Sequence, residues 1–189
     1  MAEHADFDLT AFMKQVEGQR FPPVEKWNPD FCGDIDMRIA ADGTWFYMGT
    51  PITRDRMVKL FSTVLRKDED GRTYLVTPVE KIGITVDDAH FIAVDCDVLD
   101  SGDEQLLSFK TNVGDTVVAG PQHPIRVEID DTSEEPRPYV LVRGRLEALI
   151  SRTVFYRLVE VAEHVKKGDK TELVIKSNGH DFSLGSWKE

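Results

Sequence analysis

The chain has little cysteine, and this scarcity limits both its covalent and its redox chemistry. Cys32 and Cys96 are the only two cysteines among 189 residues, and they form no CxxC-type motif. We therefore expect reduced thiols rather than a framework of disulfides. Cys96 alternates with Asp95 and Asp97 along an expected strand, so we expect it to be an inert core thiol.

Long hydrophobic runs are also missing. No apolar stretch approaches the roughly 20 residues that a membrane helix needs, and residues 1–7 contain no apolar block that would make a secretory signal. The formal net charge is -11, from 34 acidic and 23 basic residues. This acidity disfavours non-specific binding to nucleic acid or to anionic membranes, although it leaves room for a local basic site. We expect a cytoplasmic protein.

The motifs of common catalytic sites are absent from the sequence. The five histidines form no HxH, HxxxH or HExxH pattern, and neither GxSxG, GxxxxGK nor GxGxxG occurs. Asp34-x-Asp36 and Asp95-x-Asp97 each place two carboxylates on one strand face, a pattern that favours a solvated face over a metal site. The sequence therefore predicts no metal and no cofactor.

What the sequence does contain is a clear alternation of helical and strand periods. Apolar residues at helical spacing predict helices over residues 6–17, over residues 53–65 with Thr53 as the cap, and over residues 151–167. Period-two patterns bounded by turn residues predict mostly antiparallel strands. These strands are residues 34–39, 44–48, 74–77, 82–86, 91–98, 106–111, 116–119, 125–129, 139–146, 171–175 and 181–184. The fold class is α+β.

One motif occurs twice. Residues 52–86 recur without a gap as residues 150–184, a constant shift of 98, and residues 35–39 resemble residues 125–129 at a shift of 90. Capped amphipathic helices flanked by strands resemble one another by chance, but one offset across a helix, a turn and two strands favours duplication. We expect two antiparallel-sheet-plus-helix modules, residues 1–100 with the N-terminal helix and residues 101–189. Ligand sites often form where such modules meet.

Arginines concentrate in the second half, at positions 126, 137, 143, 145, 152 and 157. Arg143 and Arg145 fall on one face of the expected strand 139–146, and a fork of guanidinium groups suits a phosphate or a carboxylate. The alternative is ordinary cross-strand pairing with Glu128, Asp130 or Glu147.

Aromatic and charged residues mix in the first half. Trp27 lies in a proline-rich stretch, Trp45 and Tyr47 share a strand face, and Glu80-Lys81 follows Pro78. An aromatic surface beside charged groups can stack a base-like ligand and orient it. Taken alone, however, Trp45 and Tyr47 fit an ordinary core better.

Five longer strings carry a family resemblance: residues 22–29, 32–39, 42–52, 75–81 and 109–112. Together they make the chain, over nearly its whole length, resemble the bacterial domain of unknown function 1285 family. The resemblance implies a duplicated α+β core whose C-terminal half is superficially like a pleckstrin-homology fold. It further implies a ligand site between the halves, for a nucleotide-like molecule, and a regulatory or signal-transduction role. It supplies no catalytic residues.

Our preferred hypothesis is a non-catalytic binding or regulatory protein with a small nucleotide-type ligand, held mostly by the first half. One alternative is a hydrolase that uses Asp34, Asp36 and Glu80 with a transient metal. Another is a protein-interaction module without a small ligand. The candidate ligand-binding residues are Trp27, Asp34, Asp36, Arg38, Trp45, Tyr47, Glu80, Lys81, Asn112, Arg143 and Arg145.

Overall fold

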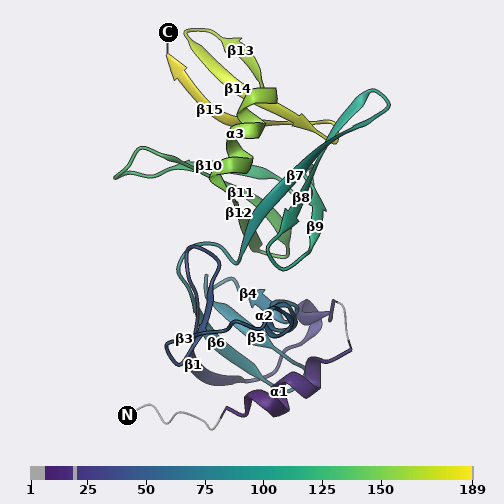
Figure 1. Cartoon of the computed structure of the whole chain (residues 1–189), viewed down its shortest axis with the longest axis vertical. Coiled ribbons are helices and arrows are strands. Elements are labelled where there is room, and N and C mark those ends of the chain that lie inside the picture. Colours follow the sequence, from purple (N-terminus) through teal and green to yellow (C-terminus); the bar gives the residue numbers. More distant parts are fainter. Residues whose placement is uncertain (1–6, 19–20, 189) are drawn as a thin grey trace. The chain divides into compact units, whose positions relative to one another are not determined.

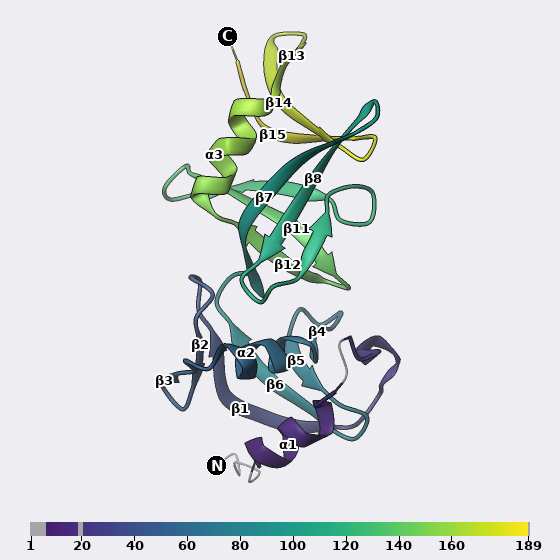
Figure 2. The same cartoon turned by 45° about the vertical axis from the view of Figure 1, so that its right-hand side comes forward.

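The structure, a computed structural model, describes residues 7–18 and 21–188. It divides into two compact units, which we call the first and second modules (Figures 1 and 2). The first contains Met1–His90 with Gly144–Leu146, and the second contains Phe91–Arg143 with Glu147–Glu189. The boundary therefore follows His90, earlier than the predicted division at residue 100.

The first module is a mixed six-stranded sheet with helices against one face. Its elements are α1 (Leu9–Val16), η1 (Val24–Lys26), β1 (Phe31–Ile39), β2 (Trp45–Tyr47), β3 (Thr50–Pro51), α2 (Asp55–Ser62), β4 (Leu65–Lys67), β5 (Thr73–Val76) and β6 (Lys81–Val86). The strand order is β3-β2-β1-β6-β5-β4, with β1 and β6 parallel and the other pairs antiparallel.

The core of this module lies between the sheet and its two helices. Ile39 pairs with Trp45 across the β1–β2 hairpin, and both are at most 1% exposed. The Trp45 ring stacks on Phe61 of α2 at 6.3 Å between centroids, and Phe12 of α1 lies 5.9 Å from Phe61. The helices thus cover one face of the sheet and leave the other for different residues.

Helix α2 is shorter than its apolar pattern predicts. Arg54, not Thr53, is the N-cap, and it makes no side-chain capping bond. At the other end the hydroxyls of Ser62 and Thr63 donate to the carbonyls of Lys59 and Leu60, each at 2.6 Å. Such local bonds compete with further helical turns, and the chain turns into β4 instead. Helix α1 has Asp8 as its N-cap, and residue 6, its predicted start, lies outside the described residues.

The second module has more strands, arranged in two sheets. Its elements are β7 (Phe91–Ser101), β8 (Glu104–Thr111), β9 (Thr116–Val118), β10 (Ile125–Ile129), β11 (Pro136–Arg143), β12 (Leu146–Ile150), α3 (Arg152–Val161), β13 (Glu163–Lys167), β14 (Lys170–Ser177) and β15 (His180–Lys188). One sheet has the order β10-β11-β12-β7-β8-β9, with β12 and β7 parallel, and the other has the order β13-β14-β15.

Two predictions for this module are wrong. The helix expected over residues 151–167 ends at Val161, and its last part is strand β13, which pairs with β14. The strand expected over residues 139–146 is broken by a turn, since Gly144 has a φ of 53° that favours glycine. Arg143 and Arg145 therefore do not share a strand face.

The arrangement fits the predicted duplication and sharpens it. The series β1–β2–β3–α2–β4–β5–β6 corresponds to β10–β11–β12–α3–β13–β14–β15, whereas β7–β8–β9 has no counterpart in the first module. Figure 1 shows these additional strands in teal. The pleckstrin-homology resemblance of the second module stays a prediction. Among the described residues no helix is long and apolar enough to cross a membrane.

Buried Ser177 joins the additional strands to the β13–β15 sheet. Its hydroxyl donates to the carbonyl of Ala119 at 2.7 Å and accepts from the N–H of Leu107 at 2.9 Å. The side chain is 0% exposed. One hydroxyl therefore satisfies two backbone groups, one in β8 and one directly after β9.

Candidate functional site

Strand register places chemically active side chains on the face of the first sheet that the helices leave uncovered. Residues directly opposite each other in neighbouring strands project to the same face. Arg66 is opposite Tyr74, Tyr74 is opposite Gly83, and Gly83 is opposite Asp34. We call this surface the polar face. It comprises Phe31, Asp34, Arg38, Phe46, Arg66, Arg72, Tyr74, Lys81 and Gly83.

Three basic side chains of the polar face lie over aromatic rings. The guanidinium carbon of Arg38 is 4.7 Å from the centroid of Phe46. Arg72 lies 5.3 Å from the Tyr74 ring, and the Lys81 ammonium lies 4.2 Å from the same ring. A cation in this position is attracted by the ring quadrupole and is held in a defined place.

Each of these cations also has a carboxylate partner. Arg38 pairs with Asp87 at 2.5 Å, and Lys81 pairs with Asp68 at 2.6 Å. Arg72 pairs with Asp34. The Arg38 and Arg72 side chains remain 42% and 47% exposed, so these two ion pairs are of the surface type, which contributes little to stability.

Gly83 makes room for the Asp34–Arg72 pair. A Cβ at this position would lie 1.9 Å from Oδ1 of Asp34 and 2.9 Å from Nη2 of Arg72. Any larger residue would displace the carboxylate. The pair can therefore cross β6 at this point because glycine has no side chain.

Arg66 anchors the proline-rich segment to the edge of this face. It is 7% exposed, and its Nη1 donates to the carbonyls of Val24 and Trp27 at 2.8 and 2.6 Å, while its Nε donates to Asp68 at 2.6 Å. Burial tends to raise the pKa of Asp68, but hydrogen bonds from Arg66 and Lys81 outweigh burial and lower it. Asp68 therefore stays ionised and holds two cations.

Tyr74 lies at the centre of the polar face with its hydroxyl fixed. The hydroxyl donates to Asp70 at 2.5 Å, and this hydrogen bond raises the pKa of Tyr74. The same bond, with a second from the backbone N–H of Arg72, lowers the pKa of Asp70. The ring stays neutral at neutral pH. Because it is only 3% exposed, it holds Arg72 and Lys81 in place and is not an open surface.

A cavity of about 370 Å³ opens beside the Asp34–Arg72 pair. Its lining includes Asp34, Lys67, Arg72, Thr73, Gly83 and His90. His90 is buried, and its Nε2 lies 2.9 Å from the hydroxyl of Thr73. The volume falls in the range of small-ligand pockets, and the lining offers both cations and hydrogen-bond acceptors.

The structure brings together some predicted site residues and separates others. Asp34, Arg38 and Lys81 lie on the polar face, as described above. Asp36 is exposed on β1, and Trp27 contributes its carbonyl to Arg66. Glu80 lies in a turn, where its N–H donates to the hydroxyl of Thr77 at 3.0 Å.

Trp45 and Tyr47 do not form the predicted aromatic surface. Trp45 is 1% exposed in the core, which is the alternative that the sequence favoured for it. Tyr47, two residues along β2, projects to the same side and is half-buried. Phe46 projects to the opposite side and underlies Arg38 instead.

The three remaining predicted residues lie beyond β6. The Asn112 side chain is hydrogen-bonded to the start of β7: its Oδ1 accepts from the N–H of Ile92 at 3.1 Å. Arg143 pairs with Asp115 at 2.9 Å and lies 5.1 Å from the ring of Phe91. Arg145 is exposed in the turn between β11 and β12.

The carboxylates of the hydrolase alternative do not converge. Asp34 lines the cavity described above and pairs with Arg72, whereas neither Asp36 nor Glu80 lines it. Within residues 7–18 and 21–188 no group of three or more histidine, cysteine, aspartate or glutamate side chains could hold a metal ion.

Sequence reasoning missed Arg66, Arg72 and Tyr74. Tyr74 could have been predicted, since alternation along β5 places its side chain on the other face of the sheet from the buried Thr73 and Leu75. The burial of Arg66 has no local signal, because its partners Val24 and Trp27 lie about forty residues earlier in the chain.

Comparison with known proteins agrees with the two-module division. Residues 22–89 match the N-terminal domain of DUF1285, a domain of unknown function, and residues 90–184 match the C-terminal domain of DUF1285, described as a protein of unknown function. No curated protein matches the chain.

Two solved structures are similar to this chain. A DUF1285 family protein from Silicibacter pomeroyi DSS-3 shares 51% identity over 95% of this chain and 96% of its own, with a TM-score of 0.87. Another, from Shewanella baltica OS155, shares 27% identity over 66% of this chain and 90% of its own, with a TM-score of 0.52. The chain belongs to the DUF1285 family.

Proposed function

We propose that this protein is a non-catalytic ligand-binding protein with a regulatory or signal-transduction role, and that the polar face binds a small nucleotide-type ligand. One observation carries the proposal: three basic side chains are seated over aromatic rings on one uncovered sheet face. The seated cations can meet a phosphate, and an exposed ring beside them can stack a base; these are the two elements that nucleotide recognition requires.

The ion pairs of the polar face suit exchange with an anionic ligand. Arg38 and Arg72 are about half exposed and already hold a carboxylate each. A phosphate can replace such a carboxylate, because the guanidinium fork accepts either group. Asp34, once released from Arg72, can accept hydrogen bonds from a base or a ribose. The ring that can stack a base is Phe31, which is 50% exposed and lies 5.9 Å from the buried Tyr74.

The test is a thermal-shift screen of the whole chain against nucleotides and nucleotide second messengers. A bound ligand stabilises the folded state by RT ln(1 + [L]/Kd), about 2.7 kcal/mol at a hundredfold excess over Kd. We expect a saturable rise in Tm with at least one of them. Calorimetry then gives the affinity.

Matched variants locate the binding. Arg38→Gln and Arg72→Gln each remove one exposed cation of the polar face, and we expect each to weaken binding about tenfold. Arg56→Gln is the control, because Arg56 is 92% exposed on α2 and paired only loosely with Glu17 at 3.5 Å. No shift with any nucleotide at millimolar concentration, or an affinity in both polar-face variants equal to that of the unmodified protein, contradicts the proposal.

A further inference from the structure

The second module contains a cavity of its own, with a volume of about 320 Å³. It lies between the start of β11, the end of β12 and helix α3, and the loop from β10 to β11 closes one side. Its floor is apolar, because Pro138, Ile150 and Phe155 line it and are buried. A concave site with an apolar floor and a few charged groups at the rim is typical of small-ligand pockets.

Two arginines stand at the rim, each beside a carboxylate. Arg152 pairs with Glu135 at 2.7 Å, and Arg137 lies 3.5 Å from Asp130. The two carboxylates differ in how firmly they are held. Asp130 accepts hydrogen bonds from the backbone N–H groups of Ser133 and Thr132, each at 2.9 Å, and these bonds keep its pKa low.

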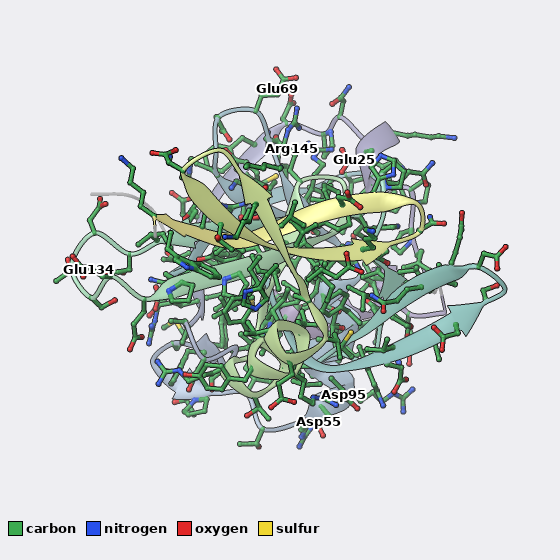
Figure 3. All side chains as sticks on the ribbon, turned by 90° about the horizontal axis from the view of Figure 1, so that it is seen from above. Glu25, Asp55, Glu69, Asp95, Glu134 and Arg145 are labelled. Carbon is green, nitrogen blue, oxygen red and sulfur yellow. The ribbon has the colours of Figure 1, made fainter. Side chains whose placement is uncertain are left out.

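Glu135 is the replaceable partner of the two. Its side chain is 58% exposed and that of Arg152 is 68% exposed, so their ion pair is weak. Glu135 lies near the hairpin tip that carries Glu134, which Figure 3 shows projecting at the margin of the molecule. A carboxylate from a ligand can therefore take its place on Arg152, because one negative charge beside the guanidinium is exchanged for another.

Tyr156 forms a further wall of the cavity. It lies on α3 next to the buried Phe155, yet it is 58% exposed. A large exposed ring at the edge of an apolar floor can cover the body of a bound molecule. The cavity thus offers an apolar floor, an aromatic wall and a guanidinium at the rim.

We propose that this cavity binds a small organic monocarboxylate with an aromatic or branched apolar body. The carboxylate replaces Glu135 on Arg152, and the body lies on Pro138, Ile150 and Phe155 beneath Tyr156. A single negative charge fits better than a phosphate dianion, because it replaces the single charge of Glu135 on Arg152, while Asp130 already balances Arg137. This site lies entirely in the second module and is independent of the function proposed for the polar face.

The probe is 3-phenylpropionate, with 3-phenylpropionamide as its neutral counterpart. Ligand-observed NMR and thermal shift on the full chain measure binding of each. We expect saturable binding of the carboxylate at millimolar concentrations and binding of the amide weaker by about tenfold, since a charge-assisted hydrogen bond is lost.

Variants on one helix separate the site from general effects of charge. Arg152→Gln is expected to weaken binding of 3-phenylpropionate about tenfold. Arg157→Gln is the matched control, since Arg157 is also on α3 and half exposed but pairs with Asp95 outside the cavity. Glu135→Gln, which removes the competing carboxylate, is expected to tighten binding about threefold.

Three outcomes overturn the proposal: no saturable binding of 3-phenylpropionate, equal binding of acid and amide, or binding unchanged by Arg152→Gln. Tyr156→Ala gives a second check that does not depend on charge. Tyr156 is exposed, so the variant should fold, and loss of its ring is expected to weaken binding about fivefold. Unchanged affinity in this variant contradicts the assigned position of the apolar body.

Discussion

The two modules contain the same series of strands and helix. Their core side chains are similar, but the side chains on the other face of the sheet differ. At the shift of 98 residues the core is kept: Leu75 corresponds to Leu173 and Ile84 to Phe182, and all four are buried. The polar face is not kept. In the second module the positions of Arg66, Tyr74, Lys81 and Gly83 are occupied by His164, Glu172, Gly179 and Asp181. Packing constrains the repeated side, whereas the other side has diverged.

The pairing of the strands is a second difference. In the first module β1 pairs with β6 and the two halves of the repeat form one sheet. In the second module β10 still contacts β15, but β13–β15 form a separate sheet and β12 pairs with β7 instead. The additional strands thus extend the sheet from its β12 edge, and β10 is left as the other edge strand. We therefore expect the two modules to differ in reactivity and in stability.

The largest expected contrast is in thiol reactivity. Cys32 in the first module is exposed, whereas Cys96 in the second is buried, and burial raises the pKa of the Cys96 thiol to about 12. Cys32 should react with a disulfide reagent at least about a hundredfold faster, because Cys96 reacts only when its module opens. Single-cysteine variants Cys32→Ser and Cys96→Ser measure the two rates. Equal rates would mean that β7 opens freely.

The next effect concerns the anchor of the proline-rich segment. Arg66→Met removes the donor to Val24, Trp27 and Asp68 and leaves polar groups unpaired. We expect the free energy of unfolding of the first module to fall by about 3 kcal/mol. Urea unfolding followed by tryptophan fluorescence measures it in a Trp187→Phe background, where only Trp27 and Trp45 remain, with Arg56→Met as the control. A loss smaller than about 1 kcal/mol contradicts the anchoring role.

The corresponding test in the second module is Ser177→Ala. This change leaves the Leu107 N–H and the Ala119 carbonyl without their buried partner. The expected loss is about 2 kcal/mol. Amide hydrogen exchange should show it in the second module alone, and Ser186→Ala, an exposed serine of β15, serves as the control. Equal loss of protection in β5 and β6 would show that the modules unfold together.

The smallest effect is at Gly83, where the two modules differ by a side chain. Gly83→Ala displaces Asp34 from Arg72 but restricts the unfolded chain, so its net effect should be less than about 1 kcal/mol. In an Asp34→Ala background the same change has no carboxylate to displace and should stabilise by about 0.5 kcal/mol. Denaturant titration of the unmodified protein, the two single variants and the double variant gives this double-mutant cycle. If the two changes in the free energy of unfolding were strictly additive, position 83 and Asp34 would not be in close contact.

Strand positions could be predicted from the sequence better than helix ends. Alternation in residues 125–129 predicted β10 with its exact bounds, since burial of one face leaves a period of two. The predicted helix ends were wrong where strand pairing determines the structure. Residues 163–167 continue a helical pattern, but they pair with β14 across a turn at Gly168. Local propensity cannot show that choice.

The candidate site was predictable only in part, for a related reason. Asp34 and Arg38 could be assigned to the uncovered face, because alternation along β1 places them on the other side from the core residues Met37 and Ile39. Arg66 could not, because a charged residue becomes buried only through partners distant in sequence. Which face of β2 the helices would cover was likewise undecidable, because Trp45 and Phe46 are both large and apolar.

The parallel pairing of β1 with β6 has a consequence for the order in which the chain can fold. Phe31 meets Lys81 in this pair, about fifty residues later, whereas the neighbouring hairpins close over short turns. Local hairpins form early, and long-range parallel pairing must wait and is slow. During synthesis, the β1–β3 meander therefore keeps β1 as an unpaired edge until β6 emerges, and only then can the two halves join into one sheet.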